Sequence, residues 1–305
     1  MRLLLVDGHY YAYRSFFAIR DLTNSRGEPT NAVFGFVKAL RKMLADLRPD
    51  AAAVIWDAGL PERRMQLLPT YKQQREETPE ALDRQLPVIE RAVAALGVCN
   101  LRLPGHEADD LIASHAAAVL RAGEGNEVVI ATNDKDIWAL VGPAVSIYST
   151  NKSDVGTAKE GFVLLGPPEV EAKWGVPPGK IPDVLALTGD AVDNIPGVDG
   201  VGLKTAARLI LEHGAAALLA ENPAAVKNEK LRAKIAAAAD RIRDNLELVR
   251  LDTDLPLPLP IVDLLIRPNP AAVVEVAREC EFRSLLAEYE ELVAAAGRPT
   301  QQDLF

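Results

Sequence analysis

The 305-residue sequence has few residues of the kinds that form disulfides or zinc sites, with 2 cysteines and 4 histidines. Cys99 and Cys280 lie far apart and lack CxxC spacing, which indicates two reduced thiols. No two histidines stand at ligand spacing, so a histidine-based mechanism has no support. No run of about 18 uncharged apolar residues occurs, and Asp7 interrupts the opening apolar segment. We therefore expect a cytoplasmic protein.

The sequence also lacks the basic excess that nucleic-acid-binding domains usually carry. It has 34 Lys and Arg against 43 Asp and Glu, a net charge of −9. Taken alone, this charge argues against a nucleic-acid partner. The composition is otherwise ordinary, with 25% charged and 49% hydrophobic residues. It excludes disorder and fibres, and the length predicts two domains.

Short apolar runs alternate with helical periodicity in the first half of the chain. Residues 2–6, 51–56 and 127–131 are predicted strands, and residues 32–47 and 82–96 are predicted helices. This alternation predicts an α/β fold with a parallel sheet covered on both faces. Ligand sites in such sheets lie beyond the carboxyl ends of the strands, where this sequence places aspartates.

The pattern changes after residue 149, and we predict four parts. Residues 1–165 form an α/β domain, and residues 166–265 form a small all-α domain, helical throughout 169–249. Within the second part, the Pro-rich segment 255–260 is expected to be extended. Residues 266–295 are C-terminal helices that pack back on the first domain, and residues 296–305 are a flexible tail.

A set of acidic residues carries the functional prediction. Its members are Asp7, Asp57, Glu107, Asp109, Asp110, Asp134, Asp136, Asp190 and Asp193. Taken singly, each acid is also explained as a helix cap, a turn residue or a first-turn partner of the helix dipole. Together, acids that end several strands of one sheet repel one another unless cations bind between them. Oxygen ligands without His or Cys favour Mg²⁺ or Mn²⁺, and two such ions roughly 4 Å apart hydrolyse phosphodiesters.

Several longer motifs follow one another along the chain. They are LLVDG at 4–8, YRSFFA at 13–18, LTNSRGEPTNAVFGF at 22–36, LPTYKQQR at 68–75, PGHEADD at 104–110, TNDKD at 132–136 and LTGDAVDNIPGVDGVGLKTAA at 187–207. The sequence resembles the bacterial 5′ nuclease family: the 5′-3′ exonuclease domain of DNA polymerase I and its stand-alone flap endonuclease relatives. The resemblance extends from residue 3 to about residue 286.

The resemblance implies a PIN-like nuclease domain with two metal sites. Asp7, Asp57, Glu107 and Asp109 would serve the first ion, Asp134, Asp136, Asp190 and Asp193 the second, with Asp110 between them. Asn133, His9 and Tyr10 depart from the family pattern near the substrate pocket. The 43 acids less these nine leave 34, equal to the number of Lys and Arg, so the acidic excess matches the predicted site.

Residues 60–82 match the helical arch of the family, beneath which a single-stranded 5′ end passes. Lys72 and Arg75 match its catalytic cations, which stabilise charge on the scissile phosphate. Tyr71 either stacks on a base or packs internally, and Arg63 and Arg64 are candidate phosphate contacts. Without the resemblance, the charged sequence of this segment favours a solvated surface helix over a functional arch. Near the amino end, Tyr13 and Arg14 match a pair close to the site, where Arg14 holds either a phosphate or an internal carboxylate.

The glycine-rich turn after Asp193 resembles the helix-three-turn-helix element that grips duplex backbone, often with a bound K⁺. Its predicted DNA-binding residues are Gly197, Gly200, Gly202, Lys204 and Thr205. Glycines alone are weak support, because turns favour them for steric reasons. Residues 201–250 hold nine basic residues against six acids, so this segment has the charge that a DNA partner requires.

The sequence ends in QQDLF, which resembles the pentapeptide that binds the bacterial sliding clamp. Gln301, Leu304 and Phe305 match its anchor positions, whereas Gln302 replaces the usual leucine.

We therefore predict a stand-alone, monomeric 5′-3′ exonuclease and flap endonuclease that acts on DNA, or on RNA-primer hybrids, in replication and repair. A PIN-type single-strand ribonuclease and a non-catalytic DNA-binding module are the alternatives.

Overall fold

The computed structural model describes residues 1–155 and 161–296 and divides into two compact units. Unit 1 comprises Met1–Trp56, Thr78–Leu101 and Pro258–Phe305, and unit 2 comprises Asp57–Glu77 and Arg102–Leu257. Among the described residues, no helix combines the length and the hydropathy of a membrane-spanning segment. The predicted domain limits stay predictions.

The strands of unit 1 are parallel and lie in the order β3-β2-β1. Their bounds are β1 Arg2–Asp7, β2 Ala51–Ile55 and β3 Cys99–Leu101. Leu3 pairs with Ala51, and Ala53 pairs with Cys99. The side chains of β2 are fully buried, as expected for apolar strands covered on both faces. The sequence predicted β1 and β2 but not β3, which is only three residues long.

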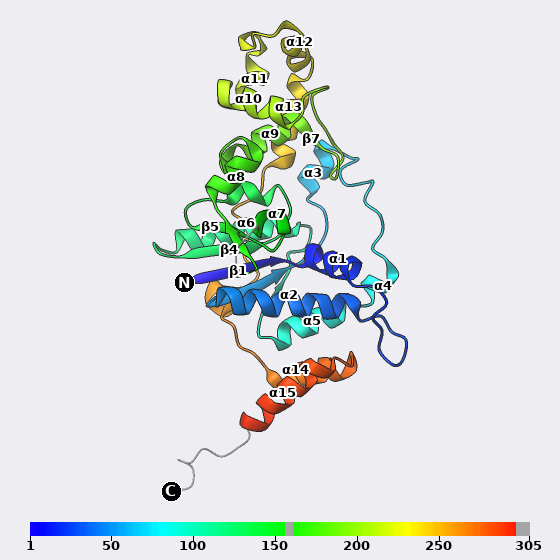
Figure 1. Ribbon diagram of the computed structural model, residues 1–305. Helices are drawn as coiled ribbons and strands as arrows, with labels where there is room; N and C mark the ends of the chain where they lie inside the picture. Colours follow the sequence, from blue (N-terminus) through cyan, green and yellow to red (C-terminus); the bar gives the residue numbers. More distant parts are fainter. Residues whose placement is uncertain (156–160, 297–305) are drawn as a thin grey trace. The chain divides into compact units, whose positions relative to one another are not determined.

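The helices of unit 1 bury one apolar stripe each. α2 buries Val33, Phe36, Leu40, Met43 and Leu47, spaced three or four residues apart. Figure 1 shows α14 and α15 in orange and red, and α14 packs against α5. The helices are α1 Gly8–Ala18, α2 Asn31–Leu47, α4 Glu80–Asp83, α5 Leu86–Ala95, η4 Ile261–Leu264, α14 Pro270–Glu279 and α15 Arg283–Ala296.

The first half of unit 2 contains the strands β4, β5 and β6. β4 and β5 are parallel, and β6 is antiparallel to β5. α6 packs beside β4 and begins at the GHEADD motif, with its acids in the first turn. The elements are β4 Glu127–Ala131, β5 Val145–Ser149, β6 Val163–Leu165, α3 Glu62–Leu67, α6 Ala108–Arg121, η1 Ile137–Leu140 and α7 Lys152–Val155.

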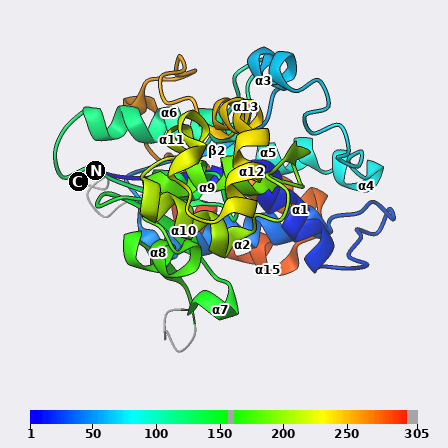
Figure 2. The same ribbon diagram turned by 90° about the horizontal axis from the view of Figure 1, so that it is seen from above.

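The second half of unit 2 is mostly helical, and Figure 2 shows α9 to α13 grouped in green and yellow. Its helices are α8 Pro167–Trp174, η2 Pro178–Lys180, α9 Ile181–Thr188, α10 Leu203–His213, α11 Ala216–Glu221, η3 Pro223–Ala225, α12 Glu229–Ala237 and α13 Ala239–Val249. A short antiparallel pair, β7 Gly189–Asp190 and β8 Ile195–Pro196, interrupts them.

The expectation that residues 169–249 are entirely helical is therefore wrong at this β7–β8 pair. Gly189 has φ +69°, which ends α9. A Cβ at Gly197 would lie 2.1 Å from the carbonyl oxygen of Thr188, so the two backbones meet only because residue 197 is glycine. This close approach fixes the turn that carries Asp190 and Asp193.

Candidate metal centre

Three carboxylates converge in unit 2. Asp136, Asp190 and Asp193 each offer an oxygen, and these oxygens lie within 4.8 Å of one another. Asp190 and Asp193 are buried and belong to the β7–β8 turn, whereas Asp136 follows the end of β4 and is half-buried. The three residues are among the four predicted for the second ion.

Local hydrogen bonds hold these acids in place. The hydroxyl of Thr132 accepts from the backbone N–H of Asp134 at 3.0 Å. The Asp134 side chain in turn accepts from the N–H of Asp136 at 3.0 Å, and the Asp190 side chain accepts from the N–H of Val192 at 2.8 Å. Such Asx turns are the ordinary use of aspartate in tight loops, and here they direct neighbouring carboxylates toward one point.

The pKa values of two acids in this region reflect burial and the nearby carboxylates. Burial raises the pKa of Asp136, and the neighbouring Asp134, Asp193 and Asp190 raise it further. Burial also raises the pKa of Asp134. Oδ1 of Asp136 is buried and accepts no hydrogen bond from the described residues. An all-oxygen donor set of this kind fits a hard divalent cation such as Mg²⁺ or Mn²⁺.

A second group of acids lies at the start of α6. Glu107 and Asp110 are buried, with 3% and 0% of their surface exposed, and both form ion pairs with Arg64 of α3. The Asp57 side chain accepts from the N–H of Ala108 at 2.8 Å, at the same helix start.

The remaining two predicted ligands are Asp109 and Asp7. Asp109 is half-buried on α6. Asp7 belongs to unit 1, where it caps α1 by accepting from the N–H of Tyr10 at 2.9 Å. Of the nine predicted acids, eight therefore belong to unit 2 and one to unit 1.

The predicted arch residues lie among these carboxylates. Lys72 is buried and forms ion pairs with Glu107 and, at 3.6 Å, with Asp193. Burial alone would lower the pKa of Lys72, but the carboxylates of Glu107, Asp193 and Asp109 raise it, so the ammonium stays charged. Arg75 is partly exposed and contacts Asp193 at 3.0 Å.

Tyr71 is packed inside unit 2 with 3% of its surface exposed. Its hydroxyl donates to Oε2 of Glu107 at 3.1 Å and to Asp193 at 3.3 Å. In this structure Tyr71 therefore packs internally, which is one of the two roles predicted for it. Stacking on a base would require its side chain to move.

The segment of Lys72 is attached to the β7–β8 turn by its backbone. The N–H of Lys72, which has φ +55°, donates to the carbonyl of Asp193 at 3.1 Å. The side chain of Asn194 donates to the carbonyl of Thr70 at 2.8 Å. A non-glycine residue held at positive φ costs free energy and is common at functional sites. These contacts explain how an otherwise unfavourable conformation at Lys72 is maintained.

Other predicted DNA contacts are placed as follows. Arg63 contacts Glu247 at 3.2 Å and Asp252 at 3.3 Å, and Arg64 is 3% exposed. In unit 1, Tyr13 hydrogen-bonds the hydroxyl of Thr78 at 2.6 Å, and Arg14 lies over the Tyr11 ring. Their DNA-binding roles stay predictions.

The glycine-rich turn leads into α10, whose first turn is exposed. Gly202 precedes the helix, Lys204 is exposed and Thr205 is half-buried. Within the described residues, no side chain caps α10. Gly200 has φ +71°, as a tight turn before a helix requires.

Sequence reasoning did not single out Lys135 or the internal pairing of Arg64. Lys135 contacts Asp190 at 2.6 Å, and its position between Asp134 and Asp136 was a usable signal. The Arg64 pairing joins residues more than 40 positions apart, and nothing local to the segment PERRM indicates it.

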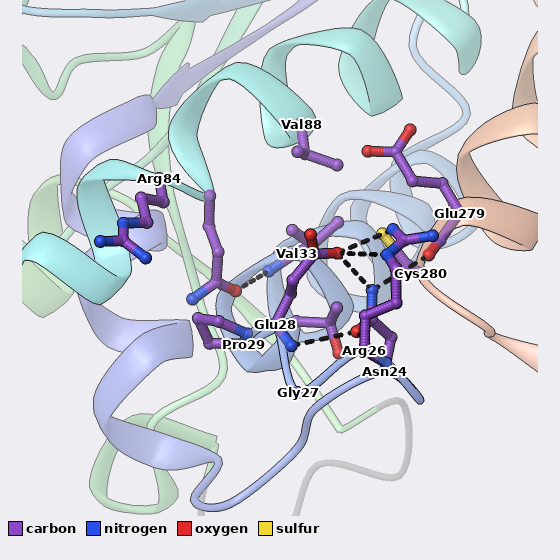
Figure 3. Close-up of a pocket in the computed structure, with 12 residues that line it drawn as sticks. Asn24, Arg26, Gly27, Glu28, Pro29, Val33, Arg84, Val88, Glu279 and Cys280 are labelled. Atoms are coloured by element: carbon purple, nitrogen blue, oxygen red, sulfur yellow. Dashed lines mark hydrogen bonds and ion pairs between the residues drawn. The ribbon is translucent and has the colours of Figure 1, made fainter.

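A separate pocket of about 420 Å³ lies in unit 1 (Figure 3). Arg26 and Asn24 both donate to the carboxylate of Glu28, at 2.7 Å each. Burial raises the pKa of the Cys280 thiol to about 11, so it stays protonated at neutral pH. The charged side chains that line it all form ion pairs, Arg26 with Glu28, Arg84 with Glu80 and Glu279 with Arg91, and we assign no chemistry to this pocket. The predicted clamp-binding residues Gln301, Leu304 and Phe305 lie outside the described residues.

Two family profiles match consecutive parts of the chain. The 5′-3′ exonuclease N-terminal resolvase-like domain matches residues 2–175, and the 5′-3′ exonuclease C-terminal SAM fold matches residues 176–272. A 5′-3′ exonuclease of Aquifex aeolicus is 36% identical over 304 residues, covering 99% of both chains. The thermostable DNA polymerase I of Thermus filiformis is 42% identical over 289 residues. This alignment covers 94% of the present chain, which spans about a third of the polymerase.

Solved structures share the fold. The T5 D15 protein co-crystallised with metal ions has a TM-score of 0.66 at 20% identity, covering 95% of this chain and 99% of that one. Human GEN1 in complex with Holliday junction DNA has a TM-score of 0.62 at 16% identity, covering 98% and 75%. The α/β part with a C-terminal helical part is thus the architecture predicted from the sequence. Because both family profiles match and the Aquifex aeolicus exonuclease aligns over nearly the whole chain, the chain belongs to the 5′-3′ exonuclease family.

Proposed function

We propose that this chain is a divalent-metal-dependent 5′ nuclease that hydrolyses DNA near the junction of a 5′ flap and duplex. It would also remove nucleotides from 5′ ends and leave 5′-phosphates. The observation that carries the proposal is the convergence of Asp136, Asp190 and Asp193 within 4.8 Å. Membership of the 5′-3′ exonuclease family supports the reaction class.

The residues present fit a metal centre. Asp136, Asp190 and Asp193, with Asp134, would hold one ion, and the acids around Glu107 would hold the other. The unpaired buried oxygen of Asp136 supports this assignment, because such an atom is costly without a cation. The chemistry that bound Mg²⁺ or Mn²⁺ supplies there is activation of water and neutralisation of charge on the leaving oxygen.

The cations beside the acids bind the scissile phosphate. Lys72 and Arg75 are both attached to Asp193, so their charges are directed at the carboxylate cluster before substrate arrives. Fixed positive groups of this kind stabilise the charge that develops on a phosphoryl group in the transition state.

Duplex DNA would be bound through the start of α10. Its first-turn backbone N–H groups and the exposed Lys204 suit a phosphate, because a helix N-terminus attracts anions. Contacts to phosphates carry no base information, so binding would be independent of sequence. A K⁺ at the preceding turn, a cytoplasmic location, a monomeric state and roles in replication and repair stay predictions.

One experiment separates this proposal from its alternatives. A labelled 5′-flap duplex, a blunt duplex and a single-stranded RNA are each incubated with protein in Mg²⁺ or EDTA, and the products are sized. The proposal expects cleavage at the flap junction that EDTA abolishes. Cleavage of RNA alone would instead indicate a single-strand ribonuclease. A gel shift of the duplex without cleavage would indicate a DNA-binding module.

Clamp binding through Gln301, Leu304 and Phe305 rests on the sequence motif alone. Removing residues 301–305 should abolish binding to the cognate clamp while leaving flap cleavage unchanged. Equal clamp affinity by calorimetry for both chains would refute this part of the proposal.

A further inference from the structure

Arg64 lies inside unit 2, where its guanidinium group is almost completely withdrawn from solvent. Its two terminal nitrogens donate to the two oxygens of Asp110, at 2.8 Å each. One of these nitrogens also donates to Glu107, and the other donates to the carbonyl of Arg250 at 3.0 Å. The planar guanidinium group of arginine can donate to both carboxylates and to the carbonyl at the same time, whereas the single ammonium group of lysine does not suit this arrangement.

Asp110 accepts hydrogen bonds from protein groups at both of its carboxylate oxygens. Besides the two bonds from Arg64, its Oδ1 accepts from the backbone N–H of Asp252 at 2.9 Å. The side chain has no exposed surface. Both oxygens are therefore bonded to other parts of the fold, and Asp110 anchors the guanidinium group of Arg64.

Arg64 contacts one particular oxygen of Glu107, which is Oε2. Arg64 and the Tyr71 hydroxyl both donate to Oε2 of Glu107, and Oε1 is the oxygen that contacts Lys72. Because Arg64 and Tyr71 hold Oε2 and Lys72 contacts Oε1, the Glu107 carboxylate cannot rotate freely and keeps a fixed orientation. Hydrogen bonds that orient metal ligands in this way typically change metal affinity about 10–100-fold when they are removed.

We propose that Arg64, anchored by Asp110, is a positioning residue that fixes the Glu107 carboxylate for divalent-cation binding. This inference rests on the proposed metal-dependent nuclease function. It assigns Arg64 a role different from a phosphate contact, because a side chain that is 3% exposed and bound to two carboxylates has no free donor fork for DNA. Through Arg250 and Asp252, the same cluster also fixes the segment that follows α13.

The test compares Arg64→Lys with Arg121→Lys, the same substitution at an exposed position at the end of α6. Mn²⁺ binding is measured by calorimetry on the full chain, and flap cleavage is measured over a Mn²⁺ titration. Circular dichroism and thermal unfolding establish that each variant is folded. Asp110→Asn and Glu107→Gln are measured alongside.

We expect Arg64→Lys to weaken Mn²⁺ binding about 10–100-fold. Cleavage at saturating Mn²⁺ should return toward the wild-type kcat, because the ligands themselves are intact. Arg121→Lys should bind Mn²⁺ like the wild type, and Asp110→Asn should lose less affinity than Glu107→Gln. A residue that contacted the phosphate would instead lower kcat or flap affinity at every metal concentration.

Unchanged Mn²⁺ affinity in folded Arg64→Lys would overturn the inference, as would a loss of flap affinity with normal metal binding. If Arg64→Lys does not fold, the double variant Arg64→Met/Asp110→Leu replaces the buried pair by apolar side chains, a change that proteins often tolerate. Wild-type Mn²⁺ affinity in that variant would overturn the inference equally. If the wild type itself neither binds Mn²⁺ nor cleaves the flap, the proposed function fails instead.

Discussion

Replacing Asp136 by asparagine should stabilise the metal-free chain while it weakens metal binding. Oxygens of Asp136, Asp190 and Asp193 lie within 4.8 Å of one another. Two unit charges at that separation repel by about 3.5 kcal/mol at an effective dielectric constant of about 20. Lys135 lies 2.6 Å from Asp190, and Arg75 lies 3.0 Å from Asp193, so part of this repulsion is already offset.

We therefore expect Asp136→Asn to raise the free energy of unfolding in EDTA by about 1–3 kcal/mol. The pKa of Asp136 is raised in the folded chain, so the native state binds the proton more tightly than the unfolded state. Stability of the metal-free wild type should accordingly rise as the pH falls from neutral toward the ordinary carboxyl range. The variant lacks this group and should show a smaller rise.

The assay is urea unfolding with EDTA or Mn²⁺ at several pH values. Asp240→Asn is the matched control, because Asp240 is 96% exposed on α13 and its pair with Arg243 contributes under about 1 kcal/mol. Mn²⁺ should stabilise the wild type and the control more than Asp136→Asn. The reasoning fails if Asp136→Asn is less stable than the wild type in EDTA, or if Mn²⁺ stabilises both equally.

Three further predictions follow from individual contacts. Lys72→Ala should lower kcat for flap cleavage about 10²-fold at saturating Mg²⁺, and an unchanged kcat would contradict its catalytic role. Lys204→Ala should weaken duplex binding equally for unrelated sequences and reduce the salt slope by about one, as gel shifts over a salt series would measure. Gly197→Ala should lower the free energy of unfolding, measured in urea, by about 2 kcal/mol or more. The reason is that a Cβ at residue 197 would lie 2.1 Å from the carbonyl oxygen of Thr188. Wild-type stability of this variant would contradict the account.

The sequence indicated the main elements because their signals are local. The continuous apolar runs that become β1, β2 and β4 and the helical period of α2 need no long-range information. The β7–β8 pair was missed, since two-residue strands leave no periodic pattern and depend on the close approach of Gly197 to Thr188.

The acidic residues could be found from the sequence because aspartates follow strands and tight turns, and parallel strands end at one edge. The sequence could not show that Asp136 lies beside Asp190 and Asp193, because these residues are 54 or more positions apart along the chain. The sequence likewise did not indicate the ion pairs of Arg64. In sequence it stands among charged residues typical of a surface helix, and only the folded chain brings Asp110 and Glu107 to it.

The most direct test of the central claim measures cleavage and binding of the same 5′-flap duplex for the wild type and Asp134→Ala. Binding is measured in Ca²⁺ and cleavage in Mg²⁺. Asp134 orders the loop of Asp136 and lies in the acidic set, so its loss should remove metal-dependent chemistry without removing the contacts that hold DNA. We predict a fall in cleavage of at least about 10²-fold with nearly unchanged flap affinity. An equal fall in cleavage and affinity, or cleavage that persists in EDTA, would contradict the account.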